Sequence, residues 1–100
     1  MVKVKIYGIP GCQLCKDLVE ELRSRGIEFE YIDVTKQGCP LWVIEKGGFP
    51  AVEICSYRDT GYYDEVVENI VRFSKMSCEE IDDYLKRQGR EESERGKTQA

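Results

Sequence analysis

Two cysteines near the N-terminus, Cys12 and Cys15, are separated by two residues and lie where a strand pattern gives way to a helical one. Cys-x-x-Cys is a weak signal by its spacing alone, but this position between a strand and a helix strengthens it. Residues three apart on a helical turn share one face with Cβ atoms about 5–6 Å apart, close enough to form a disulfide that is readily reduced. The pair therefore predicts thiol–disulfide exchange chemistry.

The position of each cysteine predicts a division of labour. A helix start leaves backbone N–H groups without partners, and these favour a thiolate at Cys12. Lowering the pKa of a thiol by two units takes about 2.7 kcal/mol, whereas the helix dipole at an exposed terminus supplies about 0.3–1 kcal/mol. Direct hydrogen bonds must supply the rest, with the backbone N–H groups of Leu14 and Cys15 and the thiol of Cys15 as candidate donors and Lys16 adding a favourable field. We expect Cys12 to be the nucleophile and Cys15 the resolving thiol.

Three further cysteines lie elsewhere in the chain: Cys39, Cys55 and Cys78. An odd number of cysteines in a chain with ample apolar content disfavours a secreted disulfide framework. We expect Cys55 to be a core residue of an apolar strand, and Cys39, between a glycine and a proline, to be exposed on a loop. Two of the three could join the Cys-x-x-Cys pair in a zinc or iron–sulfur site. Because there is no histidine and no second Cys-x-x-Cys, we assign no metal ligands.

The elements that must position the pair form a strand–helix–strand unit. Residues 2–7 alternate apolar and polar side chains, residues 12–25 place apolar residues at helical spacing before Gly26, and residues 27–34 alternate again. A short helix over 40–46, a strand over 51–57 and a turn over 59–61 are expected to follow.

The C-terminal half is less uniform in its pattern. Residues 64–73 fit an amphipathic helix, although residues 70–73 alone also fit a short strand. Ser77 and Glu80 form a capping-box pattern that predicts a helix ending at Gly89. Residues 90–100 contain almost no apolar side chain. We therefore expect a domain over residues 1–89 and a charged, flexible tail over 90–100.

Composition limits the classes of function. One hundred residues with 41% hydrophobic content suffice for a single core. The net charge of −4 comes from 19 acidic and 15 basic residues that are interspersed along the chain. No run of basic residues forms a phosphate-binding surface, which disfavours nucleic acid as a partner. No apolar run is long enough to cross a membrane, and no signal peptide pattern is present. We expect a cytoplasmic monomer without a membrane partner.

Two segments resemble a known family. Residues 7–16, Tyr-Gly-Ile-Pro-Gly-Cys-Gln-Leu-Cys-Lys, and residues 48–52, Gly-Phe-Pro-Ala-Val, resemble the glutaredoxins and glutaredoxin-like redoxins. The resemblance covers roughly residues 2–55. It implies an α/β, thioredoxin-like fold, in which a four-stranded mixed sheet is flanked by helices. It also implies a cis Pro50 facing the disulfide, and a strand over residues 70–73 antiparallel to the one at 51.

The resemblance implies the substrate-binding residues as well. Phe49 would offer its backbone to an incoming substrate strand beside Pro50, and Gly11 and Lys16 would flank the cysteine pair. We therefore expect these four residues to bind substrate: Gly11, Lys16, Phe49 and Pro50.

The implied function is reduction of disulfide-containing protein substrates through a mixed disulfide, with glutathione or a flavin-dependent thioredoxin reductase as electron donor and no bound organic cofactor. Glutathione-using relatives carry Lys at the position of Ile9, Tyr at Leu14, and a Gly-Gly-acid run at Val71 and Arg72. These departures predict poorer use of glutathione. Two alternatives stay open: a metal- or iron–sulfur-binding protein that uses the same thiolates, and an interaction module whose cysteines are idle.

Overall fold

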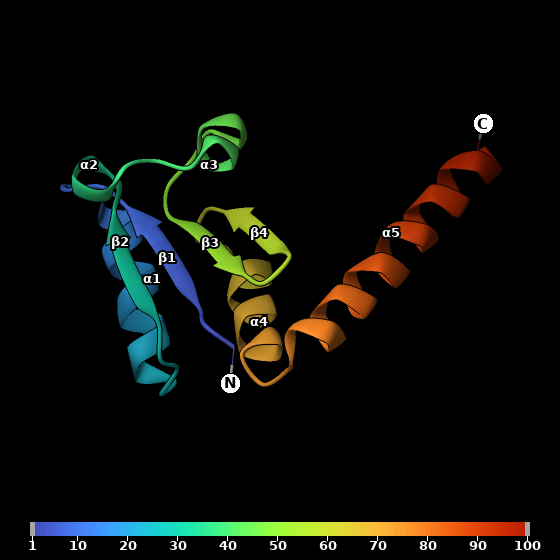
Figure 1. The fold of residues 1–100 in the computed structure, drawn as a ribbon, viewed down its shortest axis with the longest axis horizontal. Coiled ribbons are helices and arrows are strands. Elements are labelled where there is room, and N and C mark those ends of the chain that lie inside the picture. Colours follow the sequence, from blue (N-terminus) through green and yellow to red (C-terminus); the bar gives the residue numbers. More distant parts are fainter. Residues whose placement is uncertain (1, 100) are drawn as a thin grey trace.

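The computed structural model describes the backbone of residues 2–99 and the side chains of residues 2–88. Nine elements follow one another along the chain: β1 (Lys5–Gly8), α1 (Gln13–Ser24), β2 (Glu30–Asp33), α2 (Val34–Gln37), α3 (Leu41–Lys46), β3 (Ala51–Ile54), β4 (Tyr57–Thr60), α4 (Asp64–Phe73) and α5 (Cys78–Gln99). Figure 1 shows a central sheet with helices around it and α5 leading away from the body.

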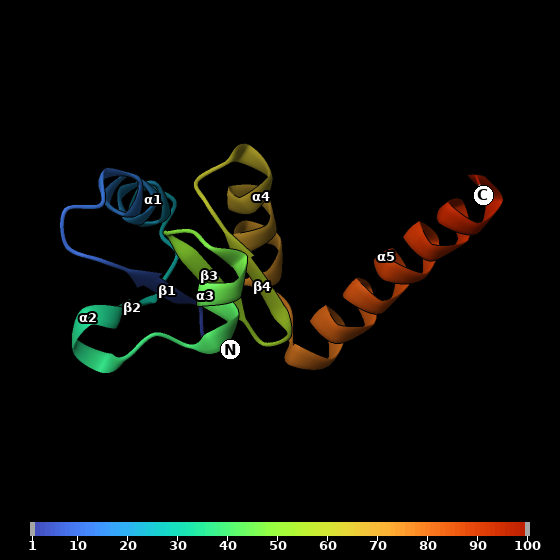
Figure 2. The same cartoon turned by 90° about the horizontal axis from the view of Figure 1, so that it is seen from above.

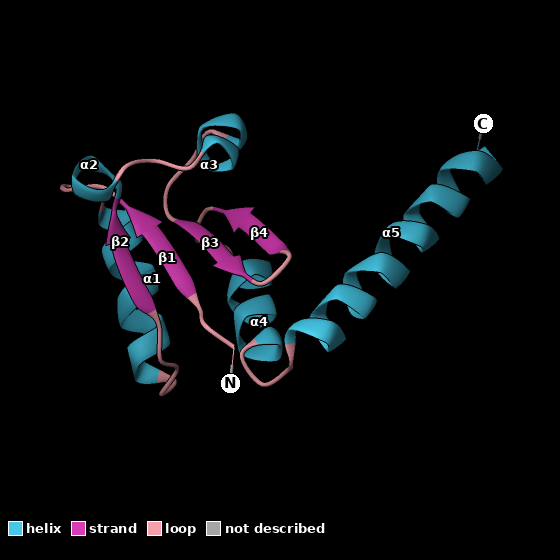
Figure 3. Cartoon of the chain, in the orientation of Figure 1, coloured by secondary structure: helices cyan, strands magenta, loops and turns pink. Residues whose placement is uncertain are grey.

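The four strands form one mixed sheet in the order β2-β1-β3-β4. β1 and β2 are parallel and joined through α1, whereas β3 is antiparallel to both β1 and β4. Figure 3 shows these strands in magenta and the helices in cyan. The strand–helix–strand unit and the expected fold class, a four-stranded mixed sheet flanked by helices, are confirmed.

The two faces of the sheet are covered differently, as the view in Figure 2 shows. α1 and α4 cover one face, where Ile6 of β1 and Val52 of β3 belong to the larger core. The opposite face carries Tyr7 and Ala51, which pack with Val43 of α3. Adjacent strand residues point to opposite faces, so the alternation in β1 and β3 specifies which side each helix covers.

The expectations for residues 57–73 need correction. The predicted turn over 59–61 is largely strand, because β4 extends to Thr60 and pairs with β3. The strand expected over 70–73 is wrong, since these residues belong to α4. Val66, Val67, Ile70 and Phe73 are all buried, and only helical spacing places this set on one face. Val71 and Arg72 were compared with a Gly-Gly-acid run on the assumption that they follow the last strand. That comparison is wrong as well, because these residues lie in α4 and the last strand, β4, ends at Thr60, directly before Gly61.

The ends of the helices also differ from expectation. α2 was not predicted; it begins after Asp33, whose carboxylate accepts a hydrogen bond from Thr35 N at 2.9 Å. The capping box before α5 is confirmed, with Ser77 N donating to Glu80 Oε1 and Glu80 N donating to Ser77 Oγ. α5 does not end at Gly89 but continues to Gln99, because one helical glycine costs only about 1 kcal/mol among good helix formers.

The division into a domain over 1–89 and a flexible tail over 90–100 stays a prediction, and the side chains of that tail lie outside those described. Among the described helices, none combines the length and apolar character needed to cross a membrane.

Candidate functional site

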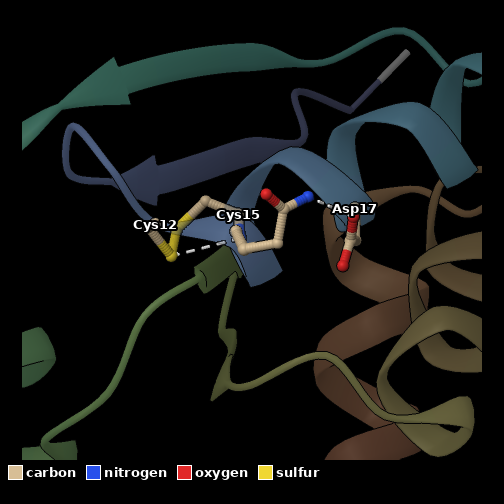
Figure 4. The surroundings of a disulfide bond; sticks show 4 residues. Cys12, Cys15 and Asp17 are labelled. Atoms are coloured by element: carbon tan, nitrogen blue, oxygen red, sulfur yellow. Dashed lines mark hydrogen bonds between the residues drawn. A yellow bond between two sulfur atoms is a disulfide. The ribbon is translucent and has the colours of Figure 1, made fainter.

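Cys12 and Cys15 lie at the start of α1 and form a disulfide with a Cα–Cα distance of 5.3 Å. Cys12 is the N-cap residue, with extended backbone, and Cys15 lies in the first turn of the helix. Figure 4 shows the two sulfur atoms bonded beside the helix start. Cys12 is half-buried, whereas Cys15 is only 1% exposed. Cys12 is therefore the more accessible of the two cysteines.

The backbone hydrogen bond expected at Cys12 is present in part. Cys15 N donates to Cys12 Sγ at 3.1 Å, which makes the Cys12 sulfur the cap of the helix. A backbone N–H directed at this sulfur stabilises a thiolate there more than a thiol, because bonds to charged acceptors are stronger. The structure therefore places the Cys12 sulfur at the N-terminal end of α1 and Cys15 within the first turn of the same helix.

The segment before β3 lies at the same end of the sheet as the cysteine pair. Ala51, the first residue of β3, pairs with Tyr7 near the end of β1, from which the chain continues to Cys12. The expected cis bond between Phe49 and Pro50 is present, and Pro50 is buried. Its carbonyl oxygen accepts a hydrogen bond from Gly61 N at 2.7 Å. The end of the β3–β4 hairpin thus holds this segment in place.

A groove of about 420 Å³ adjoins the disulfide on the side of α1 and β2. It is lined by Ile9, Pro10, Gly11, Cys12, Cys15, Lys16, Val19, Arg23, Tyr31 and Asp33. The structure therefore brings Gly11 and Lys16 together with the cysteine pair. Phe49 and Pro50 do not line this groove; they directly precede β3, whose first residue Ala51 pairs with Tyr7.

Tyr31 is a residue of this site that the sequence reasoning missed. Tyr31 pairs with Ile6 across β1 and β2 and so lies on the face that α1 covers. A Cβ at Gly8 would overlap the Tyr31 hydroxyl and would lie 3.1 Å from Cys15 Sγ. The missing side chain at Gly8 therefore makes room for the tyrosine hydroxyl close to the buried sulfur.

The electrostatic surroundings keep Tyr31 protonated. Burial of the hydroxyl raises the pKa of Tyr31, and the nearby carboxylate of Asp33 raises it further. A protonated phenol can donate a hydrogen bond. The strand alternation that places Tyr31 on the helix-covered face, together with a glycine at the end of the neighbouring strand, was the sequence signal for this contact.

The other cysteines differ from their predicted settings. Cys55 lies in the turn between β3 and β4, not within the strand, and it forms a disulfide with Cys78. Cys39 is half-buried, and its Sγ donates to Pro40 O at 3.7 Å. Within the described residues, no group of three or more His, Cys, Asp or Glu residues could hold a metal ion.

The comparisons with known proteins bear on the first half of the chain. Residues 4–52 match the family model described as glutaredoxin. The matched segment includes the cysteine pair, Tyr31 and Pro50, and it ends before Cys55. A comparison with curated proteins gives no match.

Proposed function

We propose that this chain, whose residues 4–52 match the family model described as glutaredoxin, is a thiol–disulfide oxidoreductase that reduces protein disulfides through Cys12 and Cys15. The observation that carries the proposal is the asymmetry of the pair. Cys12 is the more exposed residue and its sulfur accepts a backbone hydrogen bond, while Cys15 is buried in the first turn of the helix.

The reaction follows from this asymmetry. The Cys12 thiolate attacks one sulfur of the target disulfide and forms a mixed disulfide, and the other target sulfur leaves as a thiolate. The Cys15 thiolate then attacks Cys12 Sγ, which breaks the mixed disulfide and releases the second target thiolate. The target gains two electrons and takes two protons from solvent, and the Cys12–Cys15 disulfide is formed.

The residues around the pair support a role in substrate binding. Phe49 precedes β3 at the end of the sheet next to the pair, where its backbone can pair with an extended segment of the target. Gly11 has a φ of 79° and no side chain that would obstruct an approach to Cys12. Lys16 is exposed in the groove beside the disulfide and would attract an acidic group on the target.

For the electron donor we propose a flavin-dependent thioredoxin reductase in preference to glutathione. At the two departures that lie beside the cysteine pair, Ile9 and Leu14, the chain has apolar side chains where glutathione-using relatives have Lys and Tyr. Leu14 is half exposed, so it presents an apolar surface at a position where those relatives present a hydroxyl. Such a surface suits a protein partner better than a small charged thiol.

A trapping experiment tests the activity. With Cys15→Ser, Cys12 still attacks the target but no internal thiol resolves the mixed disulfide, so the target should stay covalently attached. Cys12→Ser is the matched control and should trap nothing. Mass spectrometry that locates the trapped target on Cys39 while Cys12 remains free would contradict the assignment.

A turnover assay tests the donor. Steady-state reduction of a protein disulfide is measured with glutathione and its reductase, and in parallel with thioredoxin reductase. We expect the second rate to be the higher, and Ile9→Lys to raise the rate with glutathione. Fast, saturable turnover of the native chain with millimolar glutathione would show that glutathione is the donor.

A further inference from the structure

The disulfide between Cys55 and Cys78 lies at the opposite end of β3 from the cysteine pair. Cys55 follows directly after Ile54, the last residue of β3, and Cys78 is the first residue of α5. Their Cα atoms are 5.5 Å apart across a sequence separation of 23 residues. This distance lies within the usual range for a disulfide.

Cys55 occupies a position that suits glycine better. It is the first of the two residues that connect Ile54 and Tyr57, which are paired in the β3–β4 hairpin. Its φ is 55°, the only positive value for a non-glycine among the described residues. Two-residue hairpin turns favour glycine where φ is positive, because a side chain is strained there. A cysteine at this position is strained where a glycine would not be. Unlike glycine, it has a sulfur atom, and this sulfur bonds to Cys78 at the start of α5.

Cys78 is the accessible member of this pair. It is exposed, whereas Cys55 is half-buried and packs against the core. Cys78 also borders a groove of about 540 Å³, which Lys3 and Lys75 line. The two lysines offset the acidic side chains of Glu79 and Glu80 in the same helical turn. An anionic thiolate can therefore approach the sulfur of Cys78 more easily than that of Cys55.

We propose that Cys55 and Cys78 form a second redox centre, which a thiol reductant opens by attack at Cys78 and which controls how firmly α5 is attached. The reductant thiolate bonds to Cys78 Sγ, the Cys55–Cys78 bond breaks, and Cys55 leaves as a thiolate that takes a proton from water. A second reductant thiolate then attacks the reductant sulfur of the mixed disulfide and releases Cys78. Cys55 and Cys78 gain two electrons, and the reductant becomes its disulfide.

The consequence concerns the attachment of α5. Figure 1 shows α5 meeting the body only near its beginning. The disulfide fixes its first residue, Ile81 is fully buried in the core, and the Tyr84 ring contacts Phe73 with centroids 5.5 Å apart. After reduction, the helix is held by the packing of Ile81, Tyr84 and Leu85 and by the hydrogen bond from Arg72 to the Tyr84 hydroxyl. Without the covalent link its first turns should open more often.

A redox titration tests the proposal on the full chain with Cys12, Cys15 and Cys39 all replaced by Ser. Only Cys55 and Cys78 then remain, so the result does not depend on the proposed reductase activity. The protein is equilibrated with mixtures of reduced and oxidised glutathione, and its free thiols are alkylated and counted by mass spectrometry. We expect an internal disulfide that forms and opens reversibly, and amide exchange at residues 79–85 at least fivefold faster in the reduced form.

Two results of the titration would overturn the proposal. The first is a native pair that remains a disulfide in excess reduced glutathione, which would make it an inert structural link. The second is a pair that never forms an internal disulfide in oxidised glutathione. Unchanged amide exchange at residues 79–85 on reduction would overturn the control of α5.

The site of attack is tested with two single-cysteine chains in the same background. Cys55→Ser leaves Cys78 and Cys78→Ser leaves Cys55, and each is reacted with oxidised glutathione. We expect Cys78 to form the mixed disulfide at least tenfold faster, and equal or reversed rates would contradict attack at Cys78. Lys75→Gln should slow this reaction two- to threefold, but should not slow reaction with the uncharged 2-hydroxyethyl disulfide.

Discussion

The two disulfides lie at opposite ends of β3 and share one design. In each, the more exposed sulfur belongs to a residue at the start of a helix, Cys12 for α1 and Cys78 for α5, and its partner is more sheltered. They differ in the length of the loop that each disulfide closes, because the first joins residues 3 apart in the sequence and the second joins residues 23 apart. Opening the first pair therefore releases one helical turn, whereas opening the second releases β4 and α4 from a closed loop.

This difference separates a chemical role from a conformational one. A pair within one helical turn can change its redox state many times while the surrounding fold stays the same. A pair that closes a long loop restricts the unfolded chain much more, and its redox state therefore changes stability. One type of bond, the disulfide, can therefore serve catalytic turnover at one end of the sheet and attachment of a helix at the other.

The largest expected effect separates the two pairs by activity. Cys12→Ser removes the proposed nucleophile and should reduce turnover of a protein disulfide by at least about 1000-fold. Cys78→Ser lies at the other end of β3 and should leave the rate within about twofold of the native rate. A loss of activity in Cys78→Ser comparable to that in Cys12→Ser would contradict the separation of roles.

Stability should show the reverse order. In the oxidised protein, Cys78→Ser should lower the free energy of unfolding by about 3 kcal/mol, because it removes a constraint on a long loop. The measurement is urea unfolding followed by circular dichroism. Under excess dithiothreitol the native chain has lost the same constraint, so the difference between the native chain and Cys78→Ser should nearly vanish. A difference of equal size in both conditions would assign the effect to packing at Cys78.

The contrast between the two pairs also explains what the sequence could predict. The Cys12–Cys15 pair, α1 and the capping box of α5 depend on residues within one or two turns of each other, so local spacing was sufficient. α4 was predictable for the same reason, and its local pattern proved a better guide to residues 70–73 than the family comparison.

The features that were missed depend on contacts between distant segments. Cys55 and Cys78 meet only after β3, β4 and α4 have folded, and no spacing rule joins residues 23 apart. β4 is stabilised by its pairing with β3 and carries polar residues that resemble a turn. The approach of Tyr31 to Cys15 requires the register of β1 against β2. In each case the position was determined by tertiary structure, which a single sequence does not specify by local pattern.

A smaller effect is expected from a methyl group placed between Tyr31 and Cys15. Gly8→Ala would introduce a Cβ that overlaps the Tyr31 hydroxyl and lies 3.1 Å from Cys15 Sγ. Such overpacking should lower the free energy of unfolding by about 1–3 kcal/mol. Gly48→Ala is the matched control, because its Cβ would meet Thr60 at an ordinary 3.6 Å, and it should change stability by less than about 0.5 kcal/mol. Equal unfolding midpoints for the two variants would show that the space at Gly8 is not filled.

The smallest effect is expected from removing the Tyr31 hydroxyl. This change tests whether a hydrogen bond from Tyr31 stabilises the thiolate of Cys15, the buried member of the first pair. When Cys15 attacks Cys12, or leaves it, Cys15 carries a negative charge, and a neighbouring phenol that donates a hydrogen bond stabilises this charge. Tyr31→Phe removes only the hydroxyl, so resolution of a preformed mixed disulfide should slow by about three- to tenfold, within the range for one bond to a charged group. Stopped-flow release of a labelled peptide from Cys12 measures this step directly. Burial and Asp33 raise the pKa of Tyr31, so the phenol remains a hydrogen-bond donor between pH 7 and 9, and the slowing in Tyr31→Phe should be present at pH 7. Tyr63→Phe, on an exposed side chain elsewhere, is the matched control and should leave the rate unchanged. Equal rates for Tyr31→Phe and the native chain at pH 7 would mean that the hydroxyl does not act on Cys15.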